Sequence, residues 1–328
     1  MERVVLGRTG LQSSRLGFGC ASMMGRVGRR RSLRALCAAF DSGVSYFDVA
    51  RSYGYGEAES VLGEFLRGRR DRVVVATKAG ISSSRPTAFR RTAKTVARSV
   101  FRLVPGLRLR VRSHLGVQFA ANLFSPEQLR ASVDESLQQL CTDYVDVLHL
   151  HDCSLATLDD DALFAESEAL VASGKVRHLG VATNIAVVHA ALRRRGGTLS
   201  VVQFPYSLVR QEAGPLVEGE ERWREVAKVA YQPFGGELEL AHLRARLSEL
   251  AVSPRMPSTL REKLQNLDRG ALADAALSGV LRGTRVDVAI CSMLDPEHVR
   301  YNVAAMQSSR FSDEDIALLR RSFRGGDL

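Results

Sequence analysis

The feature that most limits how this chain can fold is a regular alternation of short β-type runs with longer stretches of helical period. Eight runs rich in β-branched and aromatic residues occupy 15–20, 44–49, 72–77, 144–151, 176–182, 199–204, 228–233 and 286–292. Helical-period stretches cover 30–42, 57–68, 126–141, 159–173, 185–195, 219–227, 267–282 and 296–306. Eight strand-then-helix units in 328 residues favour an α/β fold closed into a (β/α)₈ barrel over an open doubly wound sheet.

The opening segment VVLGRTGLQ has two extended runs about a GRTG turn, which predicts a β-hairpin ahead of the first barrel strand. No linker or change in composition marks a boundary, so residues 1–328 are predicted to form a single barrel domain. The dinucleotide fingerprint GxGxxG is missing, because Gly17 and Gly19 are followed by Ser22 where the third glycine belongs.

Composition argues against export and against a membrane span. No window approaches 18 consecutive apolar residues, and the N-terminus MERVVLGRTG lacks the apolar core of a signal peptide. The cytoplasm is therefore the expected location. Five widely spaced cysteines without a CxxC pair give no sign of a disulfide framework or of a structural zinc site, and no metal ligands are predicted.

Four ionisable residues fall at or just beyond the ends of consecutive predicted strands. Asp48 ends the second strand, Tyr53 lies on the loop after it, Lys78 follows the third strand and His151 ends the fourth. Each alone has an ordinary structural role as a helix cap, a packed ring, a solvated charge or a core histidine. In a barrel of this kind the carboxyl ends of the strands meet at one mouth, so the four side chains are expected to share one cavity.

The chain resembles the aldo-keto reductase family over almost its whole length. The resemblance is carried by LGRTGLQSSRLGFG, FDVARSYGYGEAE, VVVATKAG, YVDVLHLH, GKVRHLGVATN, VVQFPYSL, AYQPFGG and DPEHVRYN, in the family's order and spacing. It implies a catalytic tetrad of Asp48, Tyr53, Lys78 and His151. It also implies reduction of an aldehyde or ketone, or the reverse oxidation, by hydride transfer from NAD(P)H.

The chemistry explains why these residue types are needed together. Oxygen of a carbonyl that accepts hydride gains negative charge, so a proton donor must stand within hydrogen-bond reach, and Tyr53 is that general acid. A free tyrosine has a pKa of ~10, which a nearby ammonium such as Lys78 lowers. Asp48 holds that ammonium in place, and His151 orients the substrate oxygen.

The fourth predicted strand carries a second histidine, His149. It shares the inward face of His151 by the two-residue period, and counting from the aspartate in YVDVLHLH assigns the family's histidine to His151. The extra histidine is either a hydrogen-bonded core residue or a contributor to catalysis.

The cofactor contacts follow from the resemblance. Thr183, Asn184 and Gln203 would hydrogen-bond the nicotinamide carboxamide, and Tyr231 would stack on its ring. Turn capping is the alternative for Asn184 and core packing for Tyr231. At the adenosine end the matching residues are Ser292, His298 and Asn302. Two basic side chains common in users of the phosphorylated cofactor are missing there, so NADPH is expected with NADH possible.

Residues 80–124 form an insertion after the third strand with nine Lys or Arg and no Asp or Glu. Removing those nine from the formal charge of +10 leaves +1, so the basicity is local. Residues 89–104 have the period of an amphipathic helix. The segment 85–118 is a solvated flap, a lid that attracts acidic or phosphorylated carbonyl substrates, or a contact with an anionic membrane surface. Nucleic-acid binding is not expected, because no recognised module is present.

Two other functions fit the sequence. A redox-sensing or regulatory barrel would bind the cofactor with little turnover. A biosynthetic tailoring ketoreductase or dehydrogenase would act on a larger ketone, which the insertion would suit. The oligomeric state is not predicted.

Overall fold

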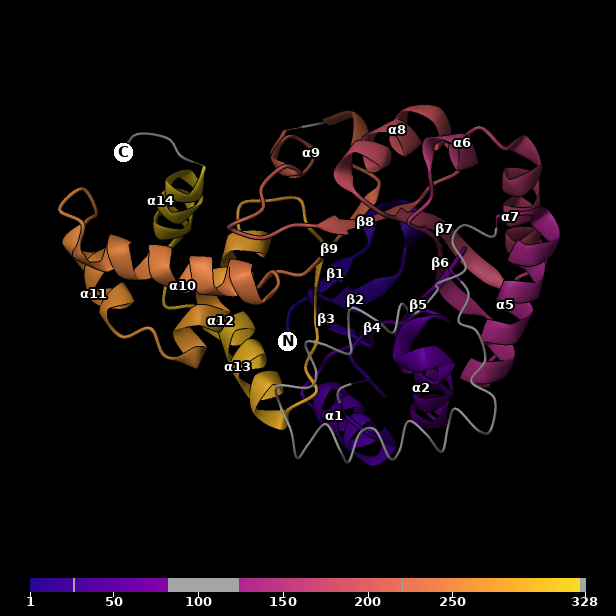
Figure 1. Cartoon of the computed structure of the whole chain (residues 1–328), viewed down its shortest axis with the longest axis horizontal. Coiled ribbons are helices and arrows are strands. Elements are labelled where there is room, and N and C mark those ends of the chain that lie inside the picture. Colours follow the sequence, from indigo (N-terminus) through magenta and orange to yellow (C-terminus); the bar gives the residue numbers. More distant parts are fainter. Residues whose placement is uncertain (26, 82–123, 220, 325–328) are drawn as a thin grey trace, which may run out of the picture.

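Eight parallel strands close into a barrel at the centre of the molecule (Figure 1). The computed structural model describes residues 1–25, 27–81, 124–219 and 221–324. In chain order the barrel strands are β3 (Leu16–Gly19), β4 (Tyr46–Asp48), β5 (Val74–Ala79), β6 (Val145–His151), β7 (Val176–Ala182), β8 (Val201–Pro205), β9 (Ala227–Tyr231) and β10 (Val288–Cys291). Each pairs with its sequence neighbour, and β10 pairs with β3 to close the ring. The predicted barrel is confirmed.

Helices surround this barrel in the part of the chain that is described. They are α1 (Arg29–Asp41), α2 (Ala58–Leu66), α5 (Pro126–Leu140), α6 (Leu155–Leu158), α7 (Asp161–Ala172), α8 (Ile185–Arg195), α9 (Gly214–Glu218), α10 (Glu237–Val252), α11 (Ser258–Gln265), α12 (Arg269–Leu281), α13 (Pro296–Gln307) and α14 (Asp313–Phe323). The start of α5 shows why its sequence predicted the beginning of a helix. The Ser125 hydroxyl accepts from the backbone N–H of Gln128, and the Gln128 side chain accepts from the backbone N–H of Ser125.

The N-terminal hairpin closes one end of the barrel. Strands β1 (Arg3–Val5) and β2 (Gln12–Ser14) pair antiparallel, as predicted. Between them Leu6 is fully buried in the same apolar cluster as inward-facing Val147 and Val229. Gly7 has φ +44°, and a Cβ there would lie 2.3 Å from the carbonyl oxygen of Glu225, so only glycine permits this approach.

The side chains inside the barrel change from apolar to polar along the barrel axis. Apolar side chains such as Val74, Val201 and Val288 fill the end beside the hairpin. Asp48 and Lys78 are buried near the carboxyl ends of β4 and β5. The polar side chains are therefore concentrated at the end of the barrel where chemistry is expected.

The region after β8 differs from prediction. No helix covers 219–227 among the described residues there, which instead form a 3₁₀ turn at Glu221–Trp223 before β9 begins at Ala227. Residues 236–266, for which no helix was predicted, form α10 and α11 on one flank of the barrel together with α14 (Figure 1). A second apolar cluster that includes Leu243, Leu247 and Leu250 packs there.

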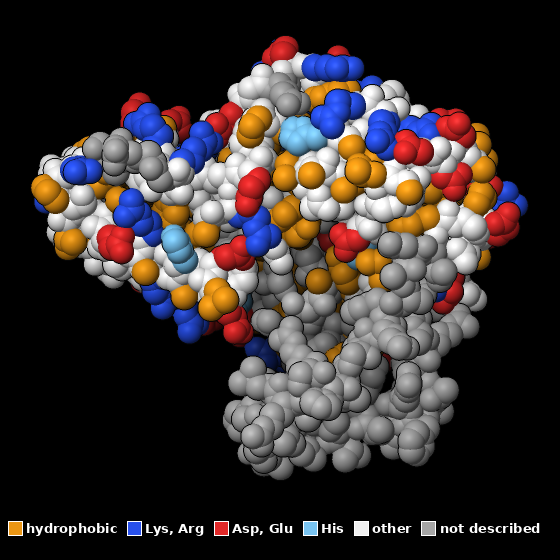
Figure 2. Space-filling view, turned by 45° about the horizontal axis from the view of Figure 1, so that its top comes forward, with side chains coloured by type: hydrophobic (Ala, Val, Ile, Leu, Met, Phe, Trp, Pro, Cys, Tyr) orange, Lys and Arg blue, Asp and Glu red, His pale blue; other side chains and the backbone are white. Residues whose placement is uncertain are grey.

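Acidic and basic side chains alternate over the described part of the face in Figure 2, so no large patch of one sign stands out there. Residues 82–123 lie outside the described residues, and so do the predictions of a lid, flap or membrane contact made for them. Among the helices that are described, none combines the length and apolar character needed to cross a bilayer. The single-domain assignment stays a prediction.

Candidate active site

A buried ion pair forms the floor of the barrel mouth. The Lys78 ammonium donates to Asp48 Oδ1 at 2.5 Å and to the backbone oxygen of Val49 at 3.1 Å. The two side chains are 1% and 4% exposed, so water barely reaches the pair. Lys78 lies within β5 rather than after it, because β5 continues to Ala79.

An irregular turn after β4 places Tyr53 beside this ion pair. The 3₁₀ segment Tyr53–Gly56 contains left-handed Gly54 and Tyr55, with φ of 60° and 62°. The Lys78 ammonium lies 4.9 Å from the centroid of the Tyr53 ring. His151 meets that ring edge-on, with centroids 6.0 Å apart and planes at 87°. The structure thus brings all four predicted tetrad residues together.

Burial and the ion pair set the protonation states. Burial lowers the pKa of Lys78, but Asp48 and Tyr53 raise it more, so the amine stays charged. Burial raises the pKa of Tyr53 to about 12, although Lys78 acts to lower it. The net direction is opposite to the lowered pKa expected from the sequence, because burial outweighs the ammonium. Tyr53 therefore holds its proton at neutral pH.

His151 is uncharged at neutral pH. Burial, and then the Lys78 ammonium, lower its pKa to about 3. A neutral imidazole has one N–H donor and one acceptor nitrogen, so His151 can donate to a substrate oxygen without competing with Lys78 for Asp48.

The residues expected to hold the nicotinamide occupy neighbouring strand ends. Gln203 of β8 is buried, and its Oε1 has no hydrogen-bond partner among the described residues. Thr183 is buried beside it, and its backbone N–H donates to the Gln203 carbonyl at 3.1 Å. Tyr231 ends β9 and is partly exposed. An unpartnered buried acceptor beside a partly exposed aromatic ring fits a carboxamide donor on a flat ring.

Asn184 departs from this arrangement. Its Oδ1 accepts from the backbone N–H of Val187 at 3.1 Å and caps the N-terminus of α8. Turn capping, the structural alternative, therefore describes its side-chain oxygen, and only its amide nitrogen remains for a carboxamide.

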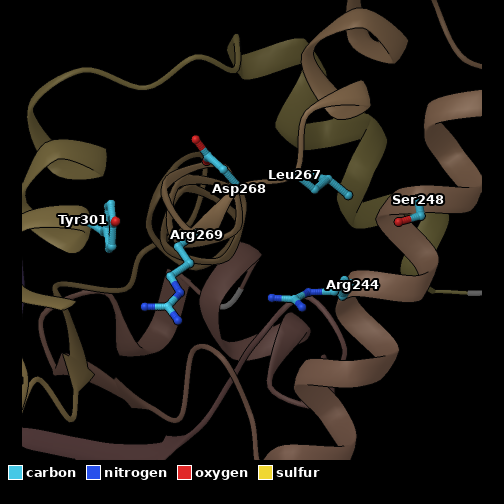
Figure 3. A pocket seen from close by; sticks show the side chains of 6 residues that line it. All are labelled: Arg244, Ser248, Leu267, Asp268, Arg269 and Tyr301. Carbon is cyan, nitrogen blue, oxygen red and sulfur yellow. The ribbon is translucent and has the colours of Figure 1, made fainter. Parts of the chain in front are cut away.

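The residues of the adenosine end lie around α13. Ser292 and His298 are exposed and Asn302 is buried. Nearby, a cavity of about 490 Å³ opens over the N-terminus of α12, between α10 and α13 (Figure 3). Its lining residues are Arg244, Ser248, Leu267, Asp268, Arg269 and Tyr301. The sequence did not point to Arg244, because the helix that carries it was not predicted.

Comparison with known proteins identifies the family of this chain. The aldo/keto reductase family model matches residues 15–323. The chain belongs to the aldo-keto reductase family. It is 30% identical to a pyridoxal 4-dehydrogenase of Microbacterium luteolum, over 97% of this chain and 96% of that protein. It is 26% identical to an NADH-specific methylglyoxal reductase of Escherichia coli K12, over 98% of both.

A solved structure gives the same fold. The holo form of an aldo-keto reductase from Bacillus halodurans matches with a TM-score of 0.69 at 23% identity, over 98% of this chain and 96% of that one. The aldo-keto reductase described here is thus an NAD(P)H-dependent oxidoreductase that interconverts a carbonyl group of a small molecule and an alcohol. The alternatives of a redox-sensing barrel and a tailoring enzyme are not favoured by relatives named as dehydrogenases and reductases.

Proposed function

We propose that Asp48, Tyr53, Lys78 and His151 are the catalytic residues of this oxidoreductase, with Tyr53 as the general acid. The observation that carries the proposal is the position of the Lys78 ammonium, 2.5 Å from a carboxylate oxygen and 4.9 Å from the centre of the Tyr53 ring. An ammonium so placed stabilises the phenolate that remains after the proton has left.

The roles follow from the charge that develops on the substrate. When bound, the reduced nicotinamide supplies hydride to the carbonyl carbon. Tyr53 donates its phenolic proton to the carbonyl oxygen. Lys78 stabilises the resulting phenolate, and Asp48 keeps Lys78 charged and in place. Neutral His151 donates an N–H to the same oxygen and orients the carbonyl.

Replacement of the proton donor tests the proposal. Tyr53→Phe keeps the ring but removes the hydroxyl, so we expect kcat for aldehyde reduction to fall by about 10²–10⁴-fold. Cofactor affinity, measured by fluorescence titration, should stay unchanged, because the proposed cofactor contacts lie after β7, on β8 and β9, and around α13, and do not include Tyr53. Tyr55→Phe is the matched control, since Tyr55 is exposed in the same turn. A fully active Tyr53→Phe enzyme would refute the assignment.

For the cofactor site we propose Thr183, Gln203, Tyr231 and the Asn184 amide around the nicotinamide, and Ser292, His298 and Asn302 at the adenosine end. We also propose NADPH as the preferred cofactor. Arg244 and Arg269 line the cavity that Tyr301, the neighbour of Asn302, borders (Figure 3). Two guanidinium groups suit a phosphate monoester, and they would replace the basic side chains absent at Ser292 and His298.

The preference is tested by removing both arginines. In Arg244→Ala/Arg269→Ala we expect the KM for NADPH to rise by about 10–100-fold, as for loss of a charged hydrogen bond, with little change for NADH. Arg246→Ala is the control, because Arg246 lies on the same helix and pairs with Glu249. An unchanged KM for NADPH would contradict the proposal and would leave NADH as the alternative.

Other expectations stay proposals. Preference for an acidic carbonyl substrate depends on residues 82–123, outside the described residues. A cytoplasmic location and the lack of nucleic-acid binding are supported by the sequence alone.

A further inference from the structure

His149 is a buried histidine at the active site that the proposed mechanism does not use. It is fully buried on β6, two residues before His151 and on the same inward face. Its register partners are Lys78 on β5 and Gly180 on β7. A Cβ at Gly180 would lie 2.5 Å from His149 Nδ1, so the imidazole occupies space that only a glycine leaves.

The imidazole has unused hydrogen-bonding capacity. Neither ring nitrogen of His149 makes a well-formed hydrogen bond among the described residues, although the Val181 backbone on β7 lies close enough to act on the imidazole. The Tyr46 hydroxyl on β4 and Gln203 Oε1 on β8 also have no hydrogen-bond partner there. An unsatisfied buried polar group destabilises the folded state, so such groups need an explanation. These groups are buried in the barrel, as is the Asp48–Lys78 pair.

The charges around His149 keep it neutral. Burial lowers its pKa well below the usual value, and Lys78 and His151 lower it further, against a smaller opposite effect of the Val181 backbone. Lys78 faces it from β5 and His151 from its own strand, while β7 presents only Gly180 at the paired position. Asp48 and Tyr46 lie on β4, the strand on the other side of β5. His149 is therefore a neutral dipole beside a buried ammonium.

The neutral dipole of the His149 imidazole can stabilise the buried Asp48–Lys78 pair. Burying an ion pair carries a desolvation cost that attraction between the charges offsets only with further polar contacts. Without them the pair neutralises by proton transfer, and Tyr53 loses the ammonium that stabilises its phenolate. We propose that His149 is a positioning residue whose neutral imidazole provides the polar surroundings that keep Lys78 and Asp48 ionised. The proposal rests on the roles proposed above for Lys78 and Tyr53.

The test compares apolar and polar replacements in the oxidation direction, in which Tyr53 must accept a proton. In His149→Leu and His149→Met we expect the ascending limb of the kcat–pH profile to move up by about one pH unit, which is about a tenfold lower rate at any pH below the limb. His149→Gln retains a polar side chain and should keep the wild-type profile. The KM for cofactor should be unchanged in all three.

Two controls separate this role from packing. Val147→Ala opens space one inward position earlier on β6 without changing polarity, so it should lower the melting temperature and leave the profile in place. Titration of tyrosinate absorbance, with Tyr53→Phe subtracted, reports the same shift without turnover. An unchanged profile in the Leu and Met variants, or an equal shift in the Gln variant, would overturn the proposal. Retention of the limb in Tyr53→Phe would instead refute the proposed role of Tyr53, whatever residue occupies position 149.

Discussion

At the scale of single residues, the active site depends on groups that burial keeps in one protonation state. His151 has its pKa lowered to about 3, chiefly by burial and then by Lys78. The unfolded chain exposes the same imidazole to water, where its pKa is about 6.5. The unfolded state therefore binds a proton that the folded state excludes over the interval between these values.

This difference predicts acid sensitivity of folding. Because the folded pKa is depressed, the stabilisation is fully present above pH ~6.5 and is lost as the pH falls towards ~3. Each such histidine contributes a slope of up to about 1.4 kcal/mol per pH unit to the free energy of unfolding. We expect His151→Gln to have the shallower slope in urea unfolding series between about pH 7 and pH 5. His189→Gln on α8 is the control, and equal slopes in the His151 variant and the wild type would contradict the prediction.

The convergence of Asp48, Tyr53, Lys78 and His151 could be predicted from the sequence, because residues at consecutive strand ends must converge once a barrel is assigned. The protonation states of these side chains could not be predicted from the sequence. The sequence predicts that Lys78 lies near Tyr53, but only the structure shows that burial of the phenol outweighs the ammonium. Asn184 illustrates the same limit, since its side chain caps α8 and the proposed cofactor contact would use the same side chain.

At the scale of elements, the turn after β4 determines where Tyr53 lies. Gly54 has φ +60°, and a Cβ there would come within 2.8 Å of the Met23 carbonyl oxygen and 2.9 Å of Met24 Cβ. The turn is therefore both left-handed and packed against the segment after β3.

Crowding and backbone strain can be separated by comparing two glycines. Gly54→Ala should lower the free energy of unfolding by about 1–3 kcal/mol and also reduce kcat, because relief of the contact with Met23 moves Tyr53. Gly68→Ala meets the same left-handed strain at φ +71° but has nothing within 4 Å of the added Cβ. It should cost about 1–2 kcal/mol and leave kcat unchanged. Equal kcat in the two variants, measured after thermal denaturation confirms folding, would exclude a role for the turn in placing Tyr53.

Elements with strong local signals were predicted well, such as α5 with its capping box. The helices α10 and α11 were missed, because Leu243, Leu247 and Leu250 pack on a cluster of their own beside the barrel. The apolar stripe was further obscured by exposed Leu238 and Leu240 at the start of α10. The cavity with Arg244 was missed for the same reason.

At the scale of the whole molecule, the hairpin and the tetrad occupy opposite ends of one barrel. Leu6→Ala removes a fully buried side chain from the interior cluster, so we expect a loss of about 2–5 kcal/mol in the free energy of unfolding. The kcat of the folded enzyme should not change. Val5→Ala, half exposed at the neighbouring position, should cost less than about 0.5 kcal/mol. A kcat that falls with stability in Leu6→Ala would show that the two ends are not independent.

The end of the barrel that the N-terminal hairpin closes also limits how substrate and cofactor can enter. With the hairpin across the amino ends of the strands, the described residues leave the proposed catalytic groups to be reached from the opposite end of the barrel. Both reactants must then share a single entrance. We therefore expect the reactant that binds nearer the buried Asp48–Lys78 pair to bind first and to dissociate last.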